Sequence, residues 1–130
     1  MNIEDFAYIA GTDKSFDEAV VSVLKAVEQK GWSLFQVYDL KERLSAKGFS
    51  QKPLKIIEIC SARYANQFLN KNSLISLCMP CKINVIGDEG GVKIIGMKPT
   101  MMSQFFPEVS EEEAREAEKD IIDIIEKARA

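Results

Sequence analysis

The sequence of 130 residues contains no histidine. This absence excludes Ser-His-Asp and Cys-His catalysis, zinc or haem held by histidine, and proton transfer by imidazole. The sequence also has no glycine-rich phosphate loop, and no pair of carboxylates stands out for acid–base catalysis. Any chemistry must therefore come from cysteine, carboxylate, lysine, tyrosine, serine or backbone groups.

Cysteines and long apolar runs are also scarce. The count of 3 cysteines is odd, which argues against a disulfide framework. No apolar run in the sequence reaches the length of a membrane-spanning helix. The first five residues, MNIED, carry acids where a secretory signal would carry bases. We therefore expect a cytoplasmic protein whose thiols stay reduced and which has no membrane partner.

The sequence lacks any block of basic residues. Its 17 Lys and Arg are interspersed with 20 Asp and Glu, which gives a net charge of −3. A protein that binds a nucleic-acid backbone needs a basic surface, so we expect no nucleic-acid partner. Hydrophobic residues make up 46% and charged residues 28%, the balance of a soluble globular protein. The length predicts a single domain over residues 1–130.

Hydrophobic periodicity and capping signals predict the secondary structure. Ser15 with Glu18, and Ser110 with Glu113, have the spacing of capping boxes, and each pair predicts the start of an amphipathic helix. In the helix after Cys60 we expect Ala65, Phe68 and Leu69 to face the core. The predicted strands are 5–11, 32–38, 54–60, 79–86 and 92–97, and the predicted helices are 15–30, 40–47, 61–70 and 110–128.

The order of these elements predicts an α+β fold. It is β-α-β-β-α-β-β-α, with an extra short helix after the second strand. We expect a largely antiparallel five-stranded sheet with helices packed on one face. A strict alternation of strands and helices would instead predict a parallel sheet. The glycine-rich hairpin at 87–91 and the short first strand favour the antiparallel arrangement.

Several short motifs occur in an order that is typical of a known family. They are Gly31-Trp32, Asp39-Leu40 with Gly48, Cys60 with Ala65, Pro80-Cys81, and Gly90-Gly91. Through them the chain resembles domain of unknown function 302, an uncharacterised prokaryotic family, over nearly its whole length. The family's Cys-Asn-Pro step is Cys60-Ser61-Ala62 here, and Cys78 is additional. The resemblance implies a TATA-binding-protein-like α+β fold that is often homodimeric, and it implies no agreed activity.

Cys60 and Cys81 form the candidate site. Cys60 ends one predicted strand and Cys81 opens the next. If these strands are antiparallel, as the family fold implies, both thiols lie at the same end of the sheet and can line one cleft, whereas a parallel crossover would separate them. Arg63, in the turn after Cys60, and Lys82, beside Cys81, could help to hold a small anionic ligand. The simpler alternative is that both cysteines are small buried apolar residues.

Cys78 and Cys81 also have CxxC spacing. In redox enzymes this motif lies at a helix N-terminus, where the helix dipole lowers the thiol pKa. Here the motif leads into a predicted strand, so the spacing favours a redox site only weakly. A closed zinc site needs four ligands, so three cysteines without histidine would require a carboxylate or a second subunit.

The segment 98–107, KPTMMSQFFP, is an unusually apolar loop. Loops carry large apolar side chains mainly where something covers them. One interpretation is that the loop folds back onto its own sheet. The other is that Met101-Met102 and Phe105-Phe106 form a dimer contact or the lid of an apolar pocket.

Three functions remain open from the sequence. The leading hypothesis is a soluble, homodimeric module that binds a small ligand or a metal ion in a cleft rimmed by Cys60 and Cys81. The second is a thiol-dependent redox or transfer enzyme with Cys81 as nucleophile and Cys60 or Cys78 as the resolving thiol. The third is a structural homodimerisation domain with inert cysteines. The residues indicate no particular cofactor, and they do not identify the ligand.

Overall fold

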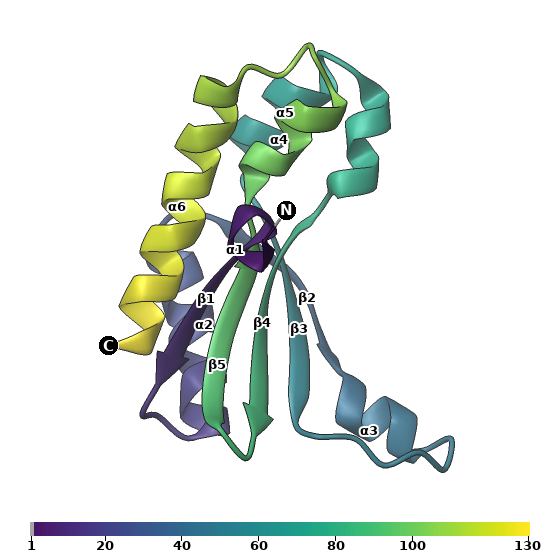
Figure 1. The fold of residues 1–130 in the computed structure, drawn as a ribbon, viewed down its shortest axis with the longest axis vertical. Helices are drawn as coiled ribbons and strands as arrows, with labels where there is room; N and C mark the ends of the chain where they lie inside the picture. The colour runs from purple at the N-terminus through teal and green to yellow at the C-terminus, as the bar shows by residue number, and fades with distance from the viewer. Residues whose placement is uncertain (1) are drawn as a thin grey trace.

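The structure is a computed structural model that describes residues 2–130. Five strands, several helices and two 3-10 segments follow one another in the order shown in Figure 1. Their bounds are α1 Ile3–Phe6, β1 Ala7–Thr12, α2 Phe16–Gln29, β2 Ser33–Asp39, α3 Leu40–Ser45, β3 Leu54–Cys60, α4 Ala62–Leu69, η1 Ser73–Cys78, β4 Cys81–Asp88, β5 Gly91–Met97, η2 Pro99–Met101, α5 Met102–Phe105 and α6 Glu111–Arg129.

The sheet is antiparallel throughout and has the order β1-β5-β4-β3-β2. Strand β4 is therefore the central strand, and β1 and β2 are the two edges. A β-bulge at Phe35 interrupts the pairing of β2 with β3. The predicted α+β fold with an antiparallel five-stranded sheet is confirmed.

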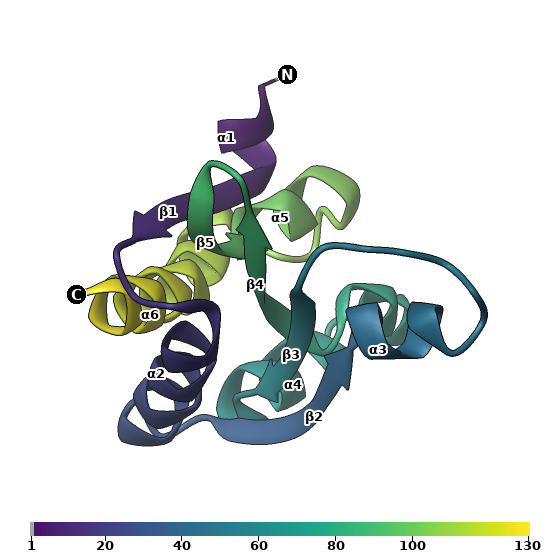
Figure 2. The same ribbon diagram turned by 90° about the horizontal axis from the view of Figure 1, so that it is seen from below.

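Helices α2 and α6 pack side by side on one face of the sheet (Figure 2). The strands turn alternate side chains toward them, because side chains in a strand point to opposite faces in turn. The core on this face consists of fully buried aliphatic side chains: Ile57, Ile59, Ile83, Val85 and Ile94 from the strands, and Val23, Val27, Ile121, Ile124 and Ile125 from the helices. On the other face, which we call the open face, the figures show the one-turn helix α1 beside β1 and no longer helix of the described residues along the strands (Figures 1 and 2).

Gly96 lets α6 approach the sheet closely. A Cβ atom built at this position would lie 3.1 Å from Ile125 Cδ1 and 3.2 Å from Ile121 Cγ2, so a larger residue would push the helix away. Two polar contacts hold the same helix: Trp32 Nε1 donates to Asp120 at 3.0 Å, and the Tyr8 hydroxyl donates to Glu126 at 2.6 Å. Helix α6 is thus fixed along its length.

The capping signals predict the helix starts correctly. Ser15 and Glu18 form the capping box of α2, and the Ser110 hydroxyl accepts from the Glu113 backbone N–H at the start of α6. The Asp39 carboxylate accepts from the Glu42 backbone N–H at 3.0 Å and so caps the start of α3. This helix ends at Ser45, two residues before the predicted end at 47.

Several boundaries and one orientation differ from the sequence-based expectation. The first strand runs from Ala7 through Thr12, after a one-turn helix, and Gly11 does not end it. The fourth strand begins at Cys81, because residues 73–78 form a 3-10 helix whose start is capped by the Asn72 side chain. In α4 the buried side chains are Tyr64 and Phe68, one turn apart, and the prediction that Leu69 faces the core is wrong.

The apolar segment 98–107 folds onto its own domain. Met101 and Met102 are buried, and Phe106 packs partly against the core, whereas Phe105 is exposed. This segment therefore supplies core residues, and Phe105 is the one of its four large apolar side chains that stays exposed. Within residues 2–130, no helix is both long enough and apolar enough to cross a membrane.

Candidate functional site

Cys60 and Cys81 lie at the same end of the sheet. Strands β3 and β4 are antiparallel, and Cys81 stands directly opposite Ile59, the neighbour of Cys60. Here β3 passes into α4 through Ser61, whose hydroxyl accepts the Tyr64 backbone N–H and caps the helix. The antiparallel arrangement that the sequence analysis required for a shared site is therefore present.

Both cysteines and Cys78 line one partly open pocket with a volume of about 30 Å³. Its walls come from the residue before β2, the end of β3, α4, η1, the start of β4, η2, α5 and α6, and they are almost wholly apolar. We call it the thiol pocket, and it is lined by Trp32, Cys60, Ser61, Tyr64, Ala65, Phe68, Cys78, Met79, Pro80, Cys81, Pro99, Met102 and Ala117.

An aromatic wall closes one side of the thiol pocket. The Tyr64 ring centroid lies 6.0 Å from that of Trp32 and 6.3 Å from that of Phe68. Such spacings are favourable for aromatic pairs. Because Trp32 is also hydrogen bonded to Asp120, this wall is tied to α6.

A second tie joins α4 to the first turn of α6. The Glu113 carboxylate accepts from Gln67 Nε2 at 2.7 Å and from Lys71 Nζ at 3.0 Å. These donors favour the charged carboxylate, with the Gln67 bond the largest cause, and they lower the Glu113 pKa to about 2. The two helices that contribute Phe68 and Ala117 to the pocket are therefore held together.

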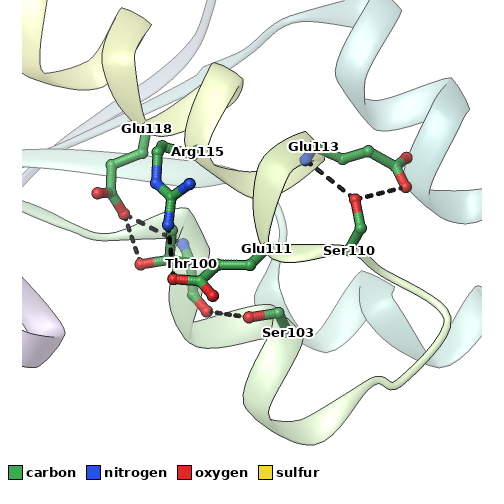
Figure 3. Close-up of polar contacts among 7 residues, drawn as sticks. All are labelled: Thr100, Ser103, Ser110, Glu111, Glu113, Arg115 and Glu118. Atoms are coloured by element: carbon green, nitrogen blue, oxygen red, sulfur yellow. Dashed lines mark hydrogen bonds and ion pairs between the residues drawn. The ribbon is translucent and has the colours of Figure 1, made fainter.

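The segment that carries Pro99 is fixed to α6 as well (Figure 3). Glu118 accepts from the Thr100 hydroxyl at 2.7 Å and from the Thr100 backbone N–H at 3.2 Å, and the Ser103 hydroxyl donates to the Thr100 carbonyl at 2.7 Å. On the outer side of this turn, Arg115 pairs with Glu111 at 2.7 Å. This network positions η2 and α5 over the thiol pocket.

The thiols are in their neutral form at neutral pH. Burial raises the pKa of Cys81 to about 11, and the nearby thiols of Cys60 and Cys78 raise it further than Lys82 lowers it. Burial also raises the pKa of Cys60 and of Cys78. A nucleophilic cysteine needs the opposite shift, so this setting gives no support to the thiol-dependent enzyme.

The three thiols do not form a metal site. Among residues 2–130 there is no group of three or more His, Cys, Asp or Glu side chains placed to hold a metal ion. A zinc site needs four ligands in tetrahedral geometry. The metal-ion form of the sequence hypothesis therefore finds no donor set in the described part of the chain.

Arg63 and Lys82 lie outside the thiol pocket. Arg63 is exposed, with its guanidinium 5.2 Å from the centroid of the Tyr64 ring. Lys82 is exposed on the opposite face of β4 from Cys81 and stands opposite Glu58 in register. Their predicted part in ligand binding stays a prediction.

Sequence reasoning missed most of the pocket wall. The sequence placed Phe68 in the core and Trp32 at the start of a strand, and it gave Tyr64 no part in a pocket, because their separation along the chain hides their convergence. One signal was present: segment 98–107 was considered as a lid for an apolar pocket, and its Pro99 and Met102 do line the thiol pocket. The larger hollows at the hairpin end, beside Gly90 and Lys93, are open surface depressions.

Comparison with known proteins identifies the family. The model of the domain of unknown function DUF302 matches residues 9–128. A crystal structure of an uncharacterized conserved protein DUF302 from Bacillus stearothermophilus superposes with a TM-score of 0.88 at 26% identity, and the match covers 95% of this chain and 98% of that one. No curated protein matches the chain. The chain therefore belongs to the DUF302 family.

Proposed function

We propose that this protein is a binding module whose thiol pocket takes up a small, uncharged, apolar group. The observation that carries the proposal is the almost wholly apolar pocket where segments far apart in the sequence meet. Small-molecule sites are typically concave and mostly apolar.

The size and chemistry of the pocket limit the ligand. A volume of about 30 Å³ leaves space for only a single small group. The occupant is therefore a single small apolar molecule or the narrow apolar end of a longer one. Neutral thiols at Cys60 and Cys81 contact such a group without charge repulsion, and their polarizable sulfur atoms suit it. A charged ligand would lose its hydration without gaining a partner.

Xenon is a suitable probe, because it enters small dry cavities and makes only dispersion contacts. We expect saturable amide shifts in NMR spectra at Cys60, Tyr64, Ala65, Cys81 and Met102 as xenon pressure rises. Absence of saturable shifts at these residues would show that the pocket takes up no ligand of this class.

Two variants sharpen the xenon experiment. Cys81→Leu fills the thiol pocket and should abolish the shifts, whereas Val21→Leu adds the same kind of bulk on an exposed turn of α2 and should leave them unchanged. Thermal melting shows whether each variant is folded. Shifts that persist in folded Cys81→Leu would place xenon elsewhere and contradict the proposal.

A further inference from the structure

All the cysteines of the chain converge on the thiol pocket. Cys60 at the end of β3, Cys78 at the end of η1 and Cys81 at the start of β4 line the same space of about 30 Å³. All three are free thiols, and each is partly exposed. Thiols that border one small space can be joined by a disulfide if their backbones are suitably spaced.

Strand register identifies the pair with suitable spacing. Ile59 stands directly opposite Cys81, and Cys60 is the next residue along β3. Strands about 4.8 Å apart, with a rise of about 3.3 Å per residue, place the Cα atoms of Cys60 and Cys81 about 6 Å apart. Disulfides usually join residues whose Cα atoms lie about 4.4–6.8 Å apart. This pair therefore meets the backbone requirement without any movement of the strands.

The position of this pair at the end of the ladder lets the two side chains meet. Within a regular ladder, alternation would turn Cys60 and Cys81 to opposite faces. Cys60 is the last residue of β3 and Cys81 is the first of β4, and both line the pocket beyond the strand ends. Charge on Cys60 raises the pKa of Cys81 more than charge on Cys78 does, as expected if Cys60 is the nearer thiol.

We propose that the thiol pocket is under redox control, through a disulfide between Cys60 and Cys81 that closes it to its ligand. The control of binding rests on the proposed function, whereas formation of the bond does not depend on it. Because both side chains border the same small space, the S–S bond takes up room that the ligand would occupy. The bond also encloses α4 and η1, which form two walls of the pocket, in a covalent loop.

The oxidant is a low-molecular-weight disulfide such as oxidised glutathione. Cys60 reacts first, because a pKa of about 11 leaves Cys81 with very little thiolate at neutral pH. The Cys60 thiolate attacks one sulfur of the oxidant, forms a mixed disulfide and releases one small thiol. The Cys81 thiolate then attacks the Cys60 sulfur and displaces the second small thiol. The protons of the two protein thiols end on the two small thiols, which are the reduced product.

The second step is intramolecular. A nucleophile held beside the bond that it attacks reacts as if it were present at very high concentration. Proximity therefore offsets the low thiolate fraction of Cys81, and the mixed disulfide on Cys60 is short-lived. The same burial slows reaction of Cys81 with reagents from solution, so the pair reacts with each other in preference to forming two separate adducts.

Mass spectrometry of dilute protein treated with oxidised glutathione tests the bond. We expect the intact chain to lose two hydrogen atoms and to carry no glutathione. Peptides mapped without reductant should join position 60 to position 81. Cys78→Ser retains only the proposed pair and should still form the bond, whereas Cys60→Ser should lose two hydrogen atoms at least about tenfold more slowly than wild type. Thermal melting shows whether each variant is folded.

Xenon titration of reduced and oxidised wild type tests the closure of the pocket. The reduced protein should show saturable shifts, the oxidised protein should show none, and a reductant should restore them. If the bond forms but the reduced protein takes up no xenon, the disulfide is established and the proposed function alone fails. Glutathione adducts in place of the bond, bond formation in Cys60→Ser as fast as in wild type, or xenon shifts that persist after oxidation would each overturn the redox control.

Discussion

Helices cover one face of the sheet and leave the other open, although isoleucines occur on both faces. On β4, the side chains of Ile83 and Val85 are fully buried under the helices, while their neighbours Asn84 and Ile86 stand on the open face. Strands that are apolar on both sides are typical of sheets buried on both sides. The difference teaches that the helices seal one side of these strands, while the apolar residues on the other side stay partly exposed.

Adjacent isoleucines on β3 give the largest expected effect. Ile57 is fully buried, whereas Ile56 stands on the open face. Ile57→Ala should lower the free energy of unfolding by about 2–5 kcal/mol, because it leaves a cavity in the covered core. In dilute protein, Ile56→Ala should lower it by less than about 1 kcal/mol. Urea unfolding measures both values. Equal losses for the two variants in dilute protein would erase the proposed difference between the faces.

Thiol reactivity gives the next largest effect. The Cys81 pKa rises from its ordinary 9.0 to about 11, which lowers the thiolate fraction at neutral pH by about a hundredfold. Alkylation of Cys81 in native protein should therefore be at least about a hundredfold slower than in urea, where the thiol is solvated. Mass spectrometry of the modified peptide measures the rates. Native alkylation as fast as in urea would instead indicate an open thiol site and revive the enzyme hypothesis.

The smallest expected effect is a loss of stability in acid. It arises at Glu113, which joins α4 to α6 beside the thiol pocket. The Glu113 pKa is lowered from 4.5 to about 2 in the folded state, so its ionised form stabilises the fold above about pH 4.5, and this contribution is lost as pH falls toward 2. Glu113→Gln should be modestly less stable than wild type at neutral pH, because these groups are partly exposed. The two proteins should converge in acid.

Urea unfolding across this pH range provides the measurement. Glu112→Gln, an exposed position on the same turn, is the matched control and should parallel wild type. The free energies of unfolding of Glu113→Gln and wild type could instead differ by a constant amount down to pH 2. That result would show that ionisation of this carboxylate does not stabilise the contact between α4 and α6.

The sequence predicted the fold well where its signal is local. The two capping boxes and the apolar stripes located α2 and α6, and the run 54–60 matched β3 residue for residue. The run 74–86 was harder, because a continuous apolar segment has no period that separates a strand from a 3-10 helix. The sequence analysis ended the preceding helix at residue 70 and did not identify the cap that the Asn72 side chain provides for η1.

The site was predictable only in part. Antiparallel pairing of β3 and β4 brings Cys60 and Cys81 to one end, and this followed from the expected topology. The rest of the wall depends on packing among segments far apart in sequence, such as Trp32 with Tyr64.

The bulge at Phe35 has a consequence for the size of any assembly. An edge strand with regular spacing can recruit the edge of another sheet, and such addition repeats without limit into fibres. The extra residue disturbs the free edge of β2 and makes it a poor template. The bulge therefore works against open-ended growth of this sheet through its β2 edge.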